Sequence, residues 1–135
     1  MQFSGRQLGE INDDVLLSRL RRSLARADVD FAAMTPEAQQ EFLGAAVPQA
    51  RALGLRTEQG VAGYVLGALW LGVGFETASP LLSRLLAARV PEARKTHAMG
   101  EWVHDRLGPN PTDASGDAAL RRSFALTEPW GRSGA

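Results

Sequence analysis

Residues 58–76 read EQGVAGYVLGALWLGVGFE, and this stretch decides the fold class. Between Glu58 and Glu76, seventeen consecutive residues carry no charge. A membrane-spanning helix needs about 20 apolar residues, whereas this run is shorter and contains five glycines. Its apolar residues cover nearly every side of the helix, which is the pattern of a helix packed among other helices. We therefore predict a buried central helix, and a membrane span is the less favoured alternative.

Four further helices are predicted around this one. The first carries an apolar stripe with helical spacing. Its acids, Glu10, Asp13 and Asp14, come early and four of its arginines come late, as the helix dipole favours. Thr35-Pro36-Glu37 begins the second with a capping residue, a proline at the first position and an acid in the first turn. Pro48 falls inside this second helix and predicts either a kink or a split into two short helices. The five predicted helices cover residues 5–27, 35–53, 57–72, 80–89 and 91–107.

These helices predict an all-α fold, a compact bundle with a C-terminal tail. A chain of 135 residues has room for one domain, and we assign the bundle to residues 1–108. Residues 109–135 are rich in Gly, Pro, Ser and Asp, a composition typical of a tail. Within the tail, residues 118–126 can form an amphipathic turn that docks through apolar anchors onto its own domain or onto a partner. The alternative is a tail with incidental apolar residues.

Composition excludes several classes of function. The chain has no cysteine, which excludes disulfides, thiolate catalysis and cysteine-ligated zinc. Fifteen basic and fifteen acidic residues give a formal net charge of zero, so the net charge does not attract the chain to nucleic acid or to anionic lipid. Residues 1–14 carry acids where a signal peptide needs an apolar core, so we expect no secretory signal and a cytoplasmic location.

Arginines cluster in the second half of the first predicted helix, at Arg19, Arg21, Arg22 and Arg26. Such a cluster can bind phosphate or an acidic partner. A solvated helix end that complements the dipole explains the same residues and is the preferred interpretation.

The sharpest chemical pattern is formed by His97, Glu101 and His104 in the last predicted helix. Spacings of four and three place the three side chains on one helical face. Glu101-x-x-His104 is also half of the motif that ferritin-like carboxylate sites use. Such a site needs a second Glu-x-x-His, and the chain has only two histidines. We therefore favour a solvated polar face, predict no metal or other cofactor, and keep the three residues as weak metal candidates.

No assembled catalytic group is apparent elsewhere. None of the serines lies in a G-x-S-x-G context. Gly72-Val73-Gly74 follows a predicted helix rather than a strand, so it does not form a phosphate loop. We predict a non-enzymatic protein.

A recognisable pattern covers residues 54–75. It begins with a glycine that ends a helix and a short turn, and continues with a helix that contains an aromatic residue, a further glycine and a phenylalanine. The residues that form the pattern are Gly54-Leu55-Arg56-Thr57-Glu58, Val61, Tyr64-Val65, Leu69, Gly72 and Phe75. This pattern resembles that of the small all-helical accessory proteins of bacterial type VI secretion gene clusters, which accompany effectors, their dedicated chaperones and PAAR-type tip proteins. The chain differs from that family by having glycine at positions 60, 63 and 67, where larger or polar side chains are usual.

The resemblance implies a cytoplasmic adaptor or co-chaperone whose partner is a secreted effector, its chaperone or the spike-tip protein. We expect aromatic side chains on and after the central helix and in the tail to bind that partner: Tyr64, Trp70, Phe75, Phe124 and Trp130. The alternative is an immunity protein that neutralises a cognate toxin, and the third reading is a metal-binding helical enzyme. The residues specify neither the partner's identity nor an oligomeric state.

Overall fold

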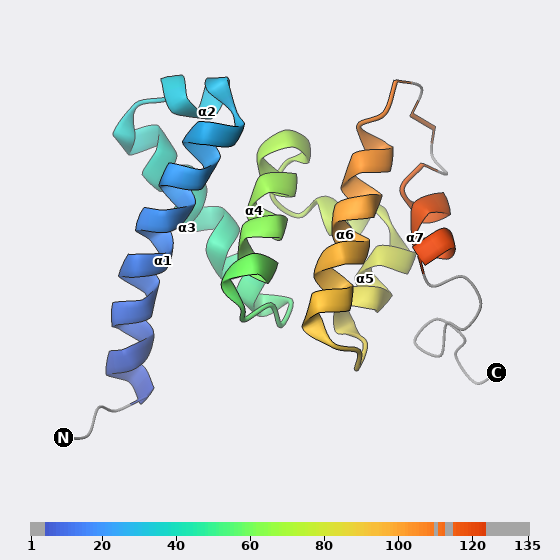
Figure 1. The fold of residues 1–135 in the computed structure, drawn as a ribbon, viewed down its shortest axis with the longest axis horizontal. Coiled ribbons are helices and arrows are strands. Elements are labelled where there is room, and N and C mark those ends of the chain that lie inside the picture. The colour runs from blue at the N-terminus through green and yellow to red at the C-terminus, as the bar shows by residue number, and fades with distance from the viewer. Residues whose placement is uncertain (1–4, 110, 113–114, 124–135) are drawn as a thin grey trace. The chain divides into compact units, whose positions relative to one another are not determined.

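The computed structural model describes residues 5–109, 111–112 and 115–123 (Figure 1), with the backbone alone for residues 5–13 and 123. These residues contain seven α-helices, one short 3-10 helix and no strand, which confirms the all-α prediction. Within the same residues, no helix combines the length and the apolar content that crossing a membrane requires.

Each of the five predicted helices is present, with ends within two residues of those expected. Two short helices and the 3-10 helix were not predicted. In chain order the elements are α1 (Gly5–Ala27), α2 (Val29–Ala33), α3 (Pro36–Ala52), α4 (Glu58–Leu71), η1 (Phe75–Ala78), α5 (Pro80–Ala87), α6 (Glu92–Arg106) and α7 (Asp117–Ser123).

The chain divides into two compact units, residues 1–45 and 46–135, which we name the N-terminal and C-terminal units. The division falls within the range 1–108 that was assigned to one domain, and inside α3. α3 nevertheless continues through Pro48, so the predicted split into two helices is wrong. Pro48 has no amide hydrogen for the carbonyl of Gly44. Because Gly44 is exposed, water can satisfy that carbonyl.

In the N-terminal unit, α1 buries one apolar stripe and α2 adds a phenylalanine. Val15, another apolar residue of α1, is 45% exposed. Phe31 of α2 is fully buried and contacts the ring of Phe42 edge-on, with the centroids 6.2 Å apart. Asp28 caps α2 by accepting a hydrogen bond from the amide of Phe31 at 2.8 Å. The described residues of the α1 stripe that are buried are Leu16, Leu20 and Leu24.

The C-terminal unit is built around three stacked aromatic rings. In this unit α6 lies between α4 and α7 (Figure 1). The ring of Phe75 stacks on Tyr64 of α4 at a centroid distance of 4.9 Å and on Trp102 of α6 at 5.8 Å. All three side chains are buried. The stack therefore joins α4, η1 and α6 through apolar contact.

Part of the predicted tail belongs to this core. Leu120 of α7 is fully buried, and Asp117 accepts hydrogen bonds from Trp102 Nε1 at 3.0 Å and from the hydroxyl of Ser79 at 2.5 Å. Gly116 has a φ of +86°, and a Cβ there would lie 2.6 Å from Trp102 Nε1, so only glycine fits. Residues 117–123 form α7, which packs on its own unit through Leu120, and the remainder of the expected turn, residues 124–126, lies outside the described residues. The other proposed anchor, Phe124, lies outside the described residues.

Glu92 joins the beginning of α6 to the beginning of α4. Its carboxylate accepts hydrogen bonds from the amides of Arg56 at 3.0 Å and Thr57 at 2.8 Å, and from the Thr57 hydroxyl at 2.5 Å. Partial burial acts to raise the pKa of Glu92, but the hydrogen bonds from Thr57 and Arg56 outweigh it and hold the pKa below its ordinary value. A Cβ at Gly60 would overlap this carboxylate, so the glycine makes room for the contact.

We expect Glu92→Gln to lower the free energy of unfolding by about 1 kcal/mol at neutral pH, because an amide cannot replace a carboxylate facing three donors. A native-state pKa below the unfolded value stabilises the protein above the unfolded pKa, and this contribution is lost as the pH falls through the native pKa. Urea denaturation should therefore show that the difference in free energy of unfolding between wild type and Glu92→Gln decreases from about pH 7 to about pH 3. Glu101→Gln, at an exposed acid of the same helix, is the control and should leave the free energy of unfolding unchanged. A difference between wild type and Glu92→Gln that is constant with pH would contradict the proposed role of the Glu92 carboxylate.

Candidate functional site

An apolar groove of about 490 Å³ lies between α4 and α6. Among the described residues that line it, His104 alone has an ionisable side chain, so the groove offers apolar contact rather than acid–base chemistry. Such a site binds by removing apolar surface from water. The lining residues are Gly63, Leu66, Gly67, Trp70, Gly100, Val103, His104, Leu107, Gly108 and Pro109.

Glycines bring the two helices together and leave the groove open. A Cβ at Gly63 would lie 3.4 Å from Met99 Cε of α6, and one at Gly67 would lie 3.1 Å from Val103 Cγ2 of the same helix. These two glycines, one turn apart on α4, therefore allow α6 to approach closely. Gly100 of α6 differs, because a Cβ there would meet no atom within 4 Å. Its missing side chain leaves space in the groove itself.

Large apolar side chains stand at the edge of the groove. Trp70 is 44% exposed and Leu107 is 45% exposed. The sequence predicted that α4 is packed among other helices on nearly every side, and this expectation is wrong at the face that carries Trp70. An exposed tryptophan beside an apolar groove is the kind of surface at which protein partners bind.

Tyr64 and Phe75, both predicted to bind a partner, are not on the surface. The Tyr64 side chain is fully buried: its hydroxyl donates to Glu76 Oε1 at 2.6 Å and accepts from the Gly74 amide at 2.9 Å. Burial, together with the hydrogen bond to Glu76, raises the pKa of Tyr64 well above its ordinary value, so the hydroxyl remains a donor at physiological pH. Phe75 is covered by the aromatic stack. These two residues build the core instead.

The partner of Tyr64 was missed in the sequence. Glu76 is 2% exposed and also accepts a hydrogen bond from Gln49 Nε2 at 2.8 Å. A buried tyrosine usually finds an acceptor for its hydroxyl, so a tyrosine inside an uncharged helix indicates that an acceptor lies elsewhere. The rule gives no position for that acceptor. Only the turn after α4 brings Glu76 back to Tyr64.

Comparison with protein families, curated proteins and solved structures finds no match. The resemblance to type VI secretion accessory proteins therefore stays a prediction. The function has to be argued from the groove and its chemistry.

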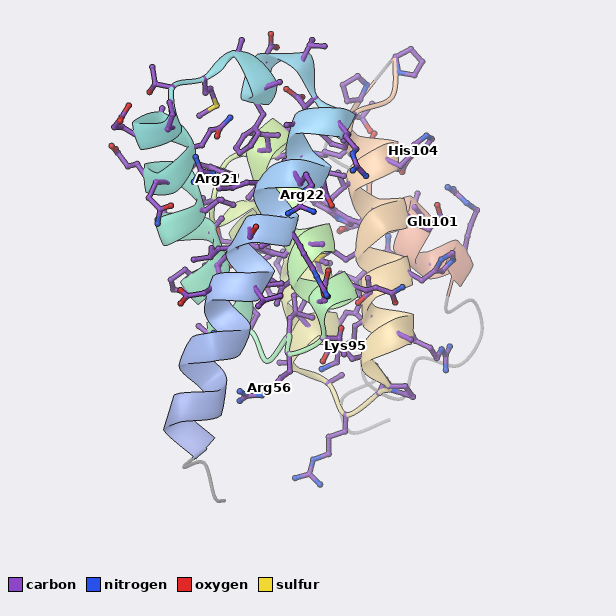
Figure 2. All side chains as sticks on the ribbon, turned by 60° about the vertical axis from the view of Figure 1, so that its left-hand side comes forward. Arg21, Arg22, Arg56, Lys95, Glu101 and His104 are labelled. Carbon is purple, nitrogen blue, oxygen red and sulfur yellow. The ribbon has the colours of Figure 1, made fainter. Side chains whose placement is uncertain are left out.

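The three weak metal candidates lie on the exposed flank of α6, where Figure 2 labels Glu101 and His104. Over the residues that the structure describes, no three or more His, Asp or Glu side chains are placed so that they could hold a metal ion together. His104 instead contributes to the groove. Of the predicted partner-binding residues, Trp70 lies at the groove, whereas Phe124 and Trp130 fall outside the described residues.

Proposed function

We propose that the chain is a non-enzymatic protein-binding domain whose groove between α4 and α6 receives an apolar helix of a partner protein. The observation that carries this proposal is a glycine-lined apolar groove with Trp70 at its edge, 44% exposed. Covering that surface is favourable by roughly 25 cal/mol for each Å² of apolar area removed from water. Tryptophan is also the residue type that most often dominates binding energy at interfaces.

A helix is the occupant that the groove suits best. Helices pack by inserting side-chain ridges into grooves on a neighbour, and at Gly100, which lines the groove, no atom within 4 Å of the Cβ position would block such a ridge. Helix-in-groove binding uses anchors at intervals of three and four residues. We therefore expect a partner helix whose apolar stripe lies between Trp70 and Leu107.

The finer proposal is a cytoplasmic adaptor or co-chaperone of a type VI secretion effector, its chaperone or the PAAR-type tip protein. Its support is the residue pattern over 54–75 described above, together with a groove whose described lining residues are mostly apolar or glycine. An immunity protein is the alternative, and the two roles differ in what co-expression does.

We expect Gly100→Leu to lower partner capture by about tenfold or more, because a leucine would fill the open groove. The substitution replaces an interior helical glycine, so helix propensity rises and unfolding does not explain a loss of binding. Gly44→Leu is the matched control: Gly44 is an equally open helical glycine that does not line the groove. The measurement is quantitative mass spectrometry of proteins captured from the source cells by each tagged variant. Equal capture by both variants would refute the groove as the binding site.

The captured protein then separates the two roles. Capture of an effector, its chaperone or a tip protein, with no protection of cells that express a neighbouring toxin, supports the adaptor. Protection from that toxin, lost in Gly100→Leu, would replace the adaptor by an immunity protein.

A further inference from the structure

A second pocket, of different chemistry, lies in the N-terminal unit. It has a volume of about 560 Å³ and is lined by residues of α1 and α3, namely Asp14, Leu17, Ser18, Arg21, Arg22 and Gln40. We propose that this pocket binds an oxyanion, a phosphate or carboxylate group, between the guanidinium groups of Arg21 and Arg22. The proposal is independent of the groove between α4 and α6 and goes beyond protein docking there.

Arg21 is held in place by a chain of hydrogen bonds. Its Nη2 donates to Gln39 Oε1 at 3.1 Å, and Gln39 Nε2 donates in turn to the backbone carbonyl of Phe31 at 2.8 Å. Phe31 is fully buried, so the chain ends on a fixed point of the core. Arg21 therefore reaches from α1 toward α3 (Figure 2) in a defined orientation. A solvated helix end, the interpretation preferred from sequence, would not fix a guanidinium in this way.

The two arginines keep donors available for a ligand. A guanidinium group has five N–H donors, and Arg21 uses one for Gln39 while Arg22 makes a long bond of 3.4 Å to the hydroxyl of Ser18. Among the side chains that the structure describes, neither arginine is paired with a carboxylate. Because a planar guanidinium matches the geometry of carboxylate and phosphate oxygens, an oxyanion is the ligand class that these donors recognise.

Asp14 defines the other end of the pocket. It precedes Arg21 by seven residues on α1, which corresponds to about 10 Å along the helix. Its charge disfavours an anion near it and thereby confines an oxyanion to the end at Arg21 and Arg22. Removing this charge should strengthen binding, whereas removing either arginine should weaken it. General attraction to a basic helix would give the same two signs, so the evidence for a formed pocket is saturable binding of a probe together with a large loss for each lining arginine.

The test is isothermal titration calorimetry of the full chain with three probes at one ionic strength: inorganic phosphate, O-phosphoserine and succinate. We expect saturable binding of at least one probe, weakened about tenfold or more by Arg21→Gln and by Arg22→Gln, and strengthened by Asp14→Asn. Arg89→Gln, which removes the same charge from an exposed position in the C-terminal unit, is the matched control and should leave binding unchanged.

The three probes also separate the sources of the oxyanion. Preference for phosphate indicates a free anion, and preference for O-phosphoserine or succinate indicates an acidic group on a larger molecule. The proposal is overturned if no probe binds saturably, or if Arg89→Gln weakens binding as much as Arg21→Gln does. If circular dichroism shows that Arg21→Gln does not fold, the proposal is tested by Asp14→Asn and Arg22→Gln, which change exposed residues. Unchanged binding in both variants overturns the proposal.

Discussion

Trp102→Ala should lower the free energy of unfolding by about 3–5 kcal/mol. The side chain is 1% exposed and stacks on Phe75. Its removal leaves a cavity at the centre of the C-terminal unit. It also takes away the indole donor of Asp117, and with it part of the attachment of α7.

Trp70→Ala is the matched control for this result, because it deletes the same side chain from the exposed edge of the groove. We expect it to change stability by less than about 1 kcal/mol. Urea denaturation gives the two free energies, and amide hydrogen exchange should show that α7 loses protection in Trp102→Ala alone. Equal destabilisation by the two substitutions would contradict the distinction between a core tryptophan and a surface one.

Glu76→Ala is expected to destabilise the protein by about 1–3 kcal/mol, because it leaves the buried Tyr64 hydroxyl without its acceptor. The hydroxyl lies 2.6 Å from the carboxylate, and half-buried Gln49 Nε2 also donates to it at 2.8 Å. Tyr64→Phe should also destabilise, since it removes the hydroxyl that binds both Glu76 and the Gly74 amide. We expect the two substitutions together to cost less than the sum of the separate costs.

A double-mutant cycle measured by urea denaturation tests this network. Because Tyr64 and Glu76 share one hydrogen bond, their coupling energy should be about 0.5–3 kcal/mol. Ser83→Ala is a useful comparison: the Ser83 hydroxyl bonds to the backbone carbonyl of Glu76 and not to its carboxylate, so it should couple weakly to Tyr64. Additive effects of Glu76→Ala and Tyr64→Phe would contradict the network.

The helices could be predicted because capping side chains at their ends bond to backbone amides only a few residues away in the sequence. Thr57 caps α4 by accepting from the Gly60 amide at 2.9 Å, and Ser79 caps α5 by accepting from the Leu82 amide at 3.0 Å. These bonds form between residues three apart, so the sequence displays them. Asp28 caps α2 in the same way, and that signal was present but not used.

Contacts between distant residues could not be predicted from local patterns. Trp102 needs an acceptor for its indole N–H, but nothing nearby in the sequence indicates that Asp117, fifteen residues later, supplies it. The assignment of residues 109–135 to a tail therefore left out α7. The same limit applied to Glu76, which looks like an ordinary loop acid in the sequence.

The candidate site was predicted in part. The apolar length of α4 indicated a helix packed against other helices, and Trp70 was expected at a binding surface. Periodicity could not show which side of an almost entirely apolar helix stays uncovered. That side depends on Gly100 of α6, whose missing side chain opens the groove. Tyr64 and Phe75 were assigned to the surface for the same reason.

The most direct test of partner binding in the groove is nuclear magnetic resonance of the ¹⁵N-labelled chain titrated with the captured partner. We predict that the signals that move first and furthest are the amides of Gly63, Gly67 and Gly100 and the indole of Trp70. The matched glycine Gly44 should not move. Shifts confined to residues outside α4 and α6, with the Trp70 indole unmoved at saturation, would contradict the proposal.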